Sequence, residues 1–165
     1  MNTPNEVIDP MHGAVGDGGM FMSQAKTLAY QLYDPARTFA NYAGHDADIK
    51  VLDGEQAQVA NLFHKNFSQT ESKALVNQLG RHAKPLAEGR DEASLEASEK
   101  AAHDVLARRH GAAGSTQLYG DANIAITKLT KAAPALKRLL IENGGQHDPD
   151  LIEHLAAMAR AKGWK

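Results

Sequence analysis

The feature that most constrains this chain is a short segment near its C-terminus, in which one helix ends and another begins. Asn143-Gly144-Gly145 supplies residues that adopt the left-handed conformation at low cost, so a helix through Leu139–Glu142 can end in a glycine C-cap. Asp148 follows as an N-cap, and Pro149 takes the first helical position, where a missing N–H costs nothing. These residues predict a compact helical hairpin. The side chains expected to pack it are Leu139, Leu140, Leu151, Ile152, Leu155 and Met158.

The composition favours helices and an aliphatic core. The chain has 165 residues, of which only 5% are aromatic, whereas good helix formers are abundant. It contains no cysteine, which excludes a disulfide, a thiolate nucleophile and a zinc–thiolate site. The net charge of −2 provides no global basic field that would attract nucleic acid or an anionic membrane.

The N-terminal sequence lacks the signals of export. Residues Met1–Glu6 have neither the basic start nor the apolar region of a signal peptide, and no run approaches the ~20 apolar residues of a membrane span. We therefore expect a soluble protein that stays inside the cell that makes it and that has no membrane partner.

Residues 1–53 are predicted to form an extended, glycine-rich arm with one short helix. Asp9–Gly19 is rich in glycine and proline and has neither a helical nor a strand period. A helix is expected over Ser23–Tyr33, with Pro35 as its stop, and the residues from Phe39 to Asp48 are expected to form a connecting loop.

The arm also carries a patch of apolar side chains with two possible roles. They could dock onto the chain's own helices, or they could anchor the arm in a neighbouring subunit, because a glycine-rich tether loses entropy when it folds back. The residues expected to bind a partner in this way are Met20, Phe21, Met22, Leu28 and Leu32.

Residues 54–165 are predicted to form a helical domain. Asp53 and Gln56 fit a capping box, and Ser68 and Glu71 fit a second one that opens a helix ending at Lys84-Pro85, so these two helices should form a short hairpin.

A third helix is expected to begin at Gly89-Arg90-Asp91 and to loosen or end at Gly111 and Gly114, and a fourth is expected over Thr116–Ala132. Nothing alternates apolar and polar residues over the length of a strand. The predicted fold is all-α, a small helical bundle of about five helices with the N-terminal arm.

The segment from about Asp53 to Gly163 resembles a helical module of tailed-bacteriophage proteins associated with head assembly, including scaffold-like proteins. Phe67–Leu75 is similar to the family's helix start "LSQxEAxxL", and Tyr119–Ala125 is similar to "WGxxYDANLALA". Leu139–Ile152 is similar to "LLExTGLGNDPxLI". The resemblance implies a phage structural protein of the virion or procapsid, made in the host bacterial cytoplasm.

The candidate reactive groups have plainer explanations. His45, Asp46 and Asp48 superficially resemble metal-binding pairs but form a polar turn without the further ligands that such sites need. His147 and His154 lie seven residues apart and cannot ligate a metal as an i, i+4 pair. We therefore expect no metal, no cofactor and no catalytic residues, and we set aside a helical hydrolase because no Glu, Asp and His set has mechanistic spacing.

Two hypotheses about function remain. In the first, the protein is a non-enzymatic phage structural or assembly protein that binds other phage structural proteins, itself, or both. The alternative is a small helical regulatory module that binds DNA or a host protein through a local basic patch. The residues of this patch would be Arg108, Arg109, Lys128, Lys131, Lys137 and Arg138. Nucleic acid is the less favoured partner, because the net charge is slightly negative.

Overall fold

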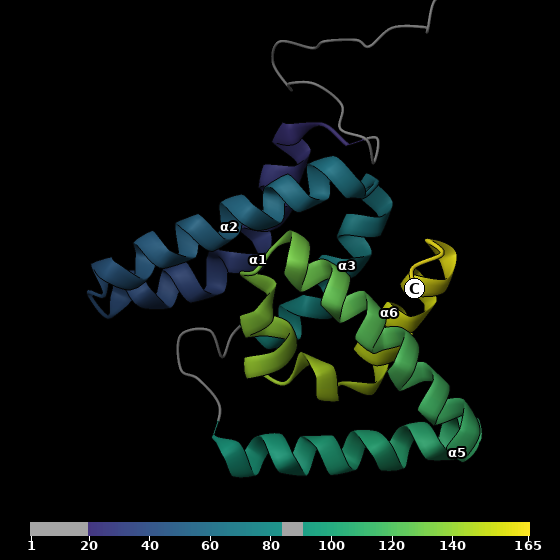
Figure 1. Cartoon of the computed structure of the whole chain (residues 1–165). Coiled ribbons are helices and arrows are strands. Elements are labelled where there is room, and N and C mark those ends of the chain that lie inside the picture. Colours follow the sequence, from purple (N-terminus) through teal and green to yellow (C-terminus); the bar gives the residue numbers. More distant parts are fainter. Residues whose placement is uncertain (1–19, 84–90) are drawn as a thin grey trace, which may run out of the picture. The chain divides into compact units, whose positions relative to one another are not determined.

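The computed structural model describes residues 20–83 and 91–165, and the chain divides into two compact units, Met1–Ala83 and Lys84–Lys165 (Figure 1). The predicted run Asp9–Gly19 and the expected helix stop at Lys84-Pro85 lie outside the described residues. Helices account for nearly all of the described chain, and it contains no strand, so the prediction of an all-α fold is confirmed. None of the described helices is both long enough and apolar enough to cross a membrane.

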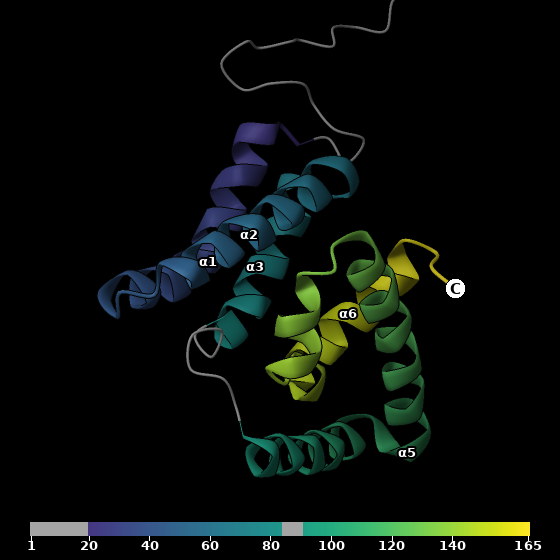
Figure 2. The same cartoon turned by 60° about the vertical axis from the view of Figure 1, so that its left-hand side comes forward.

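The N-terminal unit is built around its first helix. Helix α1 (Met22–Tyr42) has α2 (Asp46–Asn66) packed against one side and α3 (Gln69–Ala83) packed against another (Figures 1 and 2). The rings of Phe63 and Phe67 meet edge to face, with their centroids 6.3 Å apart. The largest fully buried side chains of this unit are Met20, Leu32, Tyr33, Phe63, Phe67, Leu75 and Leu79.

The predicted boundary at residue 53 lies inside α2, so the described residues 20–53 belong to the N-terminal unit and do not form a separate arm. Pro35 is accommodated within α1 rather than ending it, and Phe39 and Tyr42 belong to the same helix instead of a loop. A proline inside a helix removes one backbone hydrogen bond. Here the helix continues because Ala36 and Ala40, which follow the proline, are buried.

Two predicted capping boxes have different outcomes. Ser68 and Glu71 form theirs, with Ser68 Oγ accepting from the Glu71 N–H at 3.2 Å and the Glu71 carboxylate accepting from the Ser68 N–H at 3.2 Å. The prediction of a capping box at Asp53 and Gln56 was wrong, because both residues lie in the middle of α2. Their side chains bind Arg37 of α1 instead. Helices α2 and α3 also pack mainly against α1 rather than forming the expected hairpin with each other.

The C-terminal unit contains one long bent helix. Asp91 caps α5 (Glu92–Ala132) by accepting from the Ser94 N–H at 2.7 Å. The expected third and fourth helices are the two halves of α5, which bends at Gly111. Gly111 has φ 73° and ψ 170°, a conformation that is essentially restricted to glycine.

Helix α6 (Pro149–Ala161) packs against α5 and is linked to it at both ends. Near the bend, Arg109 of α5 contacts Asp150 and Glu153 of α6, each at 3.0 Å. At the other end of α6, Arg160 contacts Asp121 at 2.6 Å. Helix α6 therefore runs alongside the second half of α5.

The structure confirms the left-handed glycine and the N-cap that were predicted for the C-terminal hairpin. The chain passes through a π-helical turn, η1 (Arg138–Glu142), to Gly144, whose φ of 82° is left-handed. A short 3₁₀ turn, η2 (Gly145–His147), then leads to Asp148, which caps α6 by accepting from the Asp150 N–H at 3.0 Å. The six side chains expected to pack the hairpin are all buried: Leu139, Leu140, Leu151, Ile152, Leu155 and Met158.

The cap of α6 provides a direct test of this turn. Replacing Asp148 with alanine removes an acceptor for the N–H groups of Asp150 and Leu151, and we expect the free energy of unfolding to fall by about 1 kcal/mol. Urea denaturation followed by the fluorescence of Trp164 measures this loss. The control variant Asp148→Asn keeps a capping oxygen, so its free energy of unfolding should fall by less. Equal losses in the two variants would contradict the assignment of the cap.

Candidate functional site

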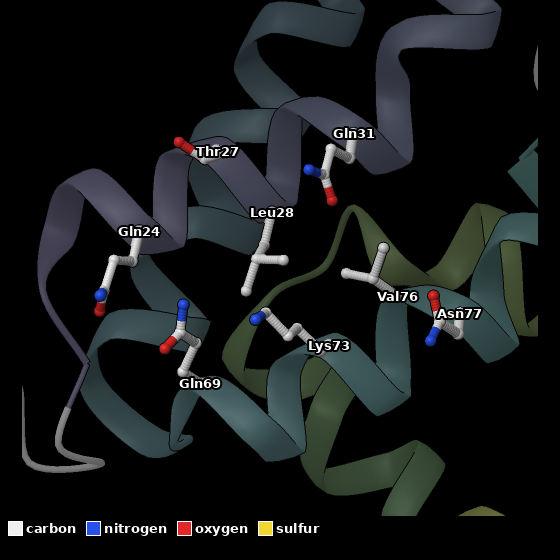
Figure 3. Close-up of a pocket in the computed structure, with 8 residues that line it drawn as sticks. All are labelled: Gln24, Thr27, Leu28, Gln31, Gln69, Lys73, Val76 and Asn77. Carbon is white, nitrogen blue, oxygen red and sulfur yellow. The ribbon is translucent and has the colours of Figure 1, made fainter.

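A polar groove runs between α1 and α3 of the N-terminal unit (Figure 3). Its volume is about 330 Å³, at the lower end of the range for binding sites. We call it the α1–α3 groove. Helix α1 contributes Gln24, Thr27, Leu28 and Gln31, and helix α3 contributes Gln69, Lys73, Val76 and Asn77. In both helices the lining residues are spaced by three or four, so each set occupies one helical face.

The groove has an apolar floor and a polar rim. Leu28 and Val76, the two apolar lining residues, are only 5% and 8% exposed. The remaining lining residues carry four carboxamides, one hydroxyl and one ammonium group. Lys73 is the only charged residue among those that line it, so the groove has positive character and contains no carboxylate of its own.

Most of the polar groups on the rim have no partner within the described part of the chain. The Gln24 carboxamide accepts from the Phe21 N–H at 3.3 Å, and the Thr27 hydroxyl donates to the Ser23 carbonyl at 3.0 Å. The side chains of Gln31, Gln69, Lys73 and Asn77 form no hydrogen bond or ion pair with another described residue. These exposed side chains therefore have donors and acceptors that a ligand can reach.

A second groove follows the other side of α1, where α2 packs, and it differs in charge. Lys26 lines it together with Asp53 and Gln56 of α2. The Arg37 guanidinium donates to the Asp53 carboxylate at 2.6 Å and also to Gln56, and it lies 5.2 Å from the centre of the Tyr30 ring. This groove therefore already contains a carboxylate, that of Asp53, and the Arg37 guanidinium already pairs with it.

The structure places the residues expected to bind a partner through the arm inside the N-terminal unit. Met20 is completely buried, and its carbonyl accepts from the His64 ring Nδ1 at 2.9 Å. Leu28 and Leu32 are also buried, whereas Phe21 and Met22 are partly buried. These contacts support the other role considered for the patch, docking onto the chain's own helices. The Met20 and Leu32 side chains, which are 0% and 1% exposed, cannot anchor in a neighbouring subunit while the unit is folded.

The residues of the expected basic patch do not gather in one place. Arg108 and Arg109 precede the bend of α5, whereas Lys128 and Lys131 lie 17 or more residues beyond it, roughly 25 Å along the helix. Arg109 is engaged by Asp150 and Glu153, so two carboxylates offset its charge. Lys137 is exposed, and Arg138 is partly buried in the π-helical turn. The patch predicted from the sequence is thus divided and partly neutralised.

A network of ion pairs joins the bend of α5 to the start of α6. The His110 ring Nε2 lies 2.9 Å from a Glu153 carboxylate oxygen, which Arg109 also contacts. The hydrogen bonds from His110 and Arg109 lower the pKa of Glu153 below its usual 4.5, although partial burial opposes this. Bonds to Glu153 and Asp150 raise the pKa of Arg109 further. The network joins the two helices.

His154, the next residue of α6, is half-buried, and its environment shifts its pKa. Burial lowers its pKa below 6.5, and its ring Nε2 is buried without a hydrogen-bond partner in the described chain. The folded unit therefore favours the neutral imidazole, whereas the unfolded chain takes up a proton as the pH falls below 6.5. Protonation of the unfolded chain should therefore destabilise the C-terminal unit.

We expect the free energy of unfolding of this unit to decrease as the pH falls from 7.5 through 6.5, and we expect His154→Gln to flatten this part of the profile. Glu153 loses its contribution only below about pH 4.5, so the two effects occupy different ranges. Urea denaturation monitored at Trp164 between pH 5 and 8 measures the stability profile of the wild-type protein and that of His154→Gln. Parallel profiles for the two proteins would show that His154 does not carry the effect.

Two of the groups considered as metal ligands, His45 and Asp48, form an exposed pair. His45 precedes α2 and pairs with Asp48 at 3.3 Å on an exposed turn of that helix. Among the residues that the structure describes, no group of three His, Asp or Glu side chains is placed to hold a metal ion.

Sequence reasoning did not find the α1–α3 groove. The residues were visible as rows of amides at helical spacing, Gln24 with Gln31 and Gln69 with Asn77. What was missing was the pairing of the two helices, because α3 was expected to pack on α2. Comparisons of the chain with protein-family models, curated proteins and solved structures found no match.

Proposed function

We propose that the protein is a non-enzymatic structural or assembly component of a bacteriophage virion or procapsid and that it acts through contacts with other proteins. The observation that carries this proposal is the resemblance of residues 53–163 to head-assembly proteins of tailed phages. In the fold, all three resembling segments have packing or capping roles. Ser68 and Glu71 cap α3, Ala122 and Ala125 lie in the core, and Asp148 caps α6.

The α1–α3 groove supports a binding role for the N-terminal unit. Carboxamides both donate and accept hydrogen bonds, so they suit the peptide groups of another protein. The alternative of a regulatory module that binds DNA has less support, because the predicted basic patch is divided and Arg109 is engaged by two carboxylates.

The proposal predicts that the protein sediments with phage particles. Cells that carry the gene in its phage context are induced, and procapsids, mature particles and free protein are separated on density gradients. Quantitative mass spectrometry then gives the copies of this chain per particle. We expect many copies in procapsids, in virions, or in both. If the chain is abundant as free protein and absent from both kinds of particle, the proposal is wrong.

A further inference from the structure

The α1–α3 groove places one unpaired cation at the centre of a row of amides. On α3, Lys73 lies between Gln69 and Asn77, four residues from each, so the three side chains share one face. Figure 3 shows the side chains of Leu28 and Lys73 pointing toward each other across the groove. The Lys73 ammonium has no ion pair with another described residue.

This arrangement is complementary to a carboxylate. None of the eight residues lining the groove is acidic, so a bound anion would meet no like charge from them. A carboxylate can accept one hydrogen bond from the Lys73 ammonium and others from the carboxamide N–H groups of Gln69 and Asn77. The carboxamides of Gln24 and Gln31 line the opposite wall and can pair with peptide N–H and C=O groups.

The dimensions of the groove favour an extended chain over a small anion. From Gln69 to Asn77 the α3 wall spans eight residues, about 12 Å, which is the length of roughly four residues of extended peptide. The floor of Leu28 and Val76 can receive an aliphatic side chain. Because Lys73 lies at the middle of the row, a peptide whose acidic group is bound there continues in both directions. This favours an Asp or Glu side chain over a chain terminus.

We propose that the α1–α3 groove binds an extended segment of a partner protein, with an Asp or Glu side chain at Lys73 and aliphatic contacts to Leu28 and Val76. This inference rests on the proposed function, since it names the kind of contact through which the protein joins an assembly. It assigns the recognition to the N-terminal unit and leaves the C-terminal unit for other roles.

The test uses the full chain and three defined peptides. The probe is fluorescein-labelled Ser-Val-Glu-Val-Ser with an amidated C-terminus, and the matched peptides carry Gln or Lys in place of Glu. Fluorescence anisotropy at low salt should give at least about tenfold tighter binding of the Glu peptide than of the Gln peptide. In ¹⁵N-labelled protein, the side-chain amide signals of Gln31, Gln69 and Asn77 should shift when the Glu peptide is added.

Charge reversal makes the prediction specific. Lys73→Glu should abolish binding of the Glu peptide and bind the Lys peptide more tightly than the Gln peptide. The variant should stay folded, because the side chain is exposed on α3. The control Lys26→Glu reverses an exposed cation that lines the groove on the other side of α1 and should leave Glu-peptide binding unchanged.

Three results would overturn the inference: equal binding of the Glu and Gln peptides, signal shifts that avoid the groove amides, or the same loss in Lys26→Glu as in Lys73→Glu. None of these three results decides whether the wild-type protein associates with particles, because that association is measured separately. Selective peptide binding by a protein that is absent from particles would refute the proposed function and keep the groove assignment.

Discussion

Replacing Phe63 with alanine is expected to lower the free energy of unfolding of the N-terminal unit by about 3–5 kcal/mol. The Phe63 ring is completely buried in α2 and packs edge to face on Phe67. Its removal would leave a cavity in the core of the N-terminal unit, and it would also remove the edge-to-face contact with Phe67, the residue that follows α2. A loss of this size is a large fraction of the stability of a small domain.

The measurement is urea denaturation followed by circular dichroism, with hydrogen exchange used to locate the loss in residues 20–83. Val51→Ala is the matched control on α2, because Val51 is 53% exposed and its truncation should change stability by less than about 0.5 kcal/mol. Similar losses in the two variants would show that α2 does not pack through Phe63.

Leu155→Ala is expected to cost the C-terminal unit about 2–4 kcal/mol. Leu155 of α6 is completely buried, as is Leu140 of the preceding turn, and both contribute to the core in which the hairpin meets α5. Truncation would leave a cavity where the surrounding backbone is held by the Gly144 turn and by the ion pairs of Arg109 and Arg160, so the site cannot collapse easily.

The loss is measured at Trp164 in urea, with Leu95→Ala as the control. Leu95 lies near the start of α5 and is only partly buried, so its truncation should cost less. A loss below about 0.5 kcal/mol for Leu155→Ala would mean that the terminal hairpin is not packed as described.

Local signals in the sequence predicted some of the helix ends. The caps at Ser68 and Asp148 and the left-handed Gly144 depend on hydrogen bonds within a few residues, so the sequence around each one contains the information. The bend at Gly111 was also visible, because a glycine pair interrupts an otherwise helical pattern.

Long-range packing could not be predicted in the same way. Pro35 normally marks the end of a helix, but the burial of the alanines after it keeps α1 helical to Tyr42. Asp53 and Gln56 have the spacing of a cap, yet Arg37 from another helix binds them. The same limitation hid the α1–α3 groove, which exists only because two helices separated by α2 in the sequence pack side by side.

The most direct test of the account is site-specific photo-crosslinking inside assembling particles. A photoreactive amino acid replaces Gln31 on the wall of the α1–α3 groove, and a second protein carries it at Gln58, an exposed position on α2 that does not line the groove. We expect crosslinks from position 31, but not from position 58, to a segment of another particle protein that contains Asp or Glu. Crosslinks that are absent from position 31, or equally frequent from both positions, would contradict the account.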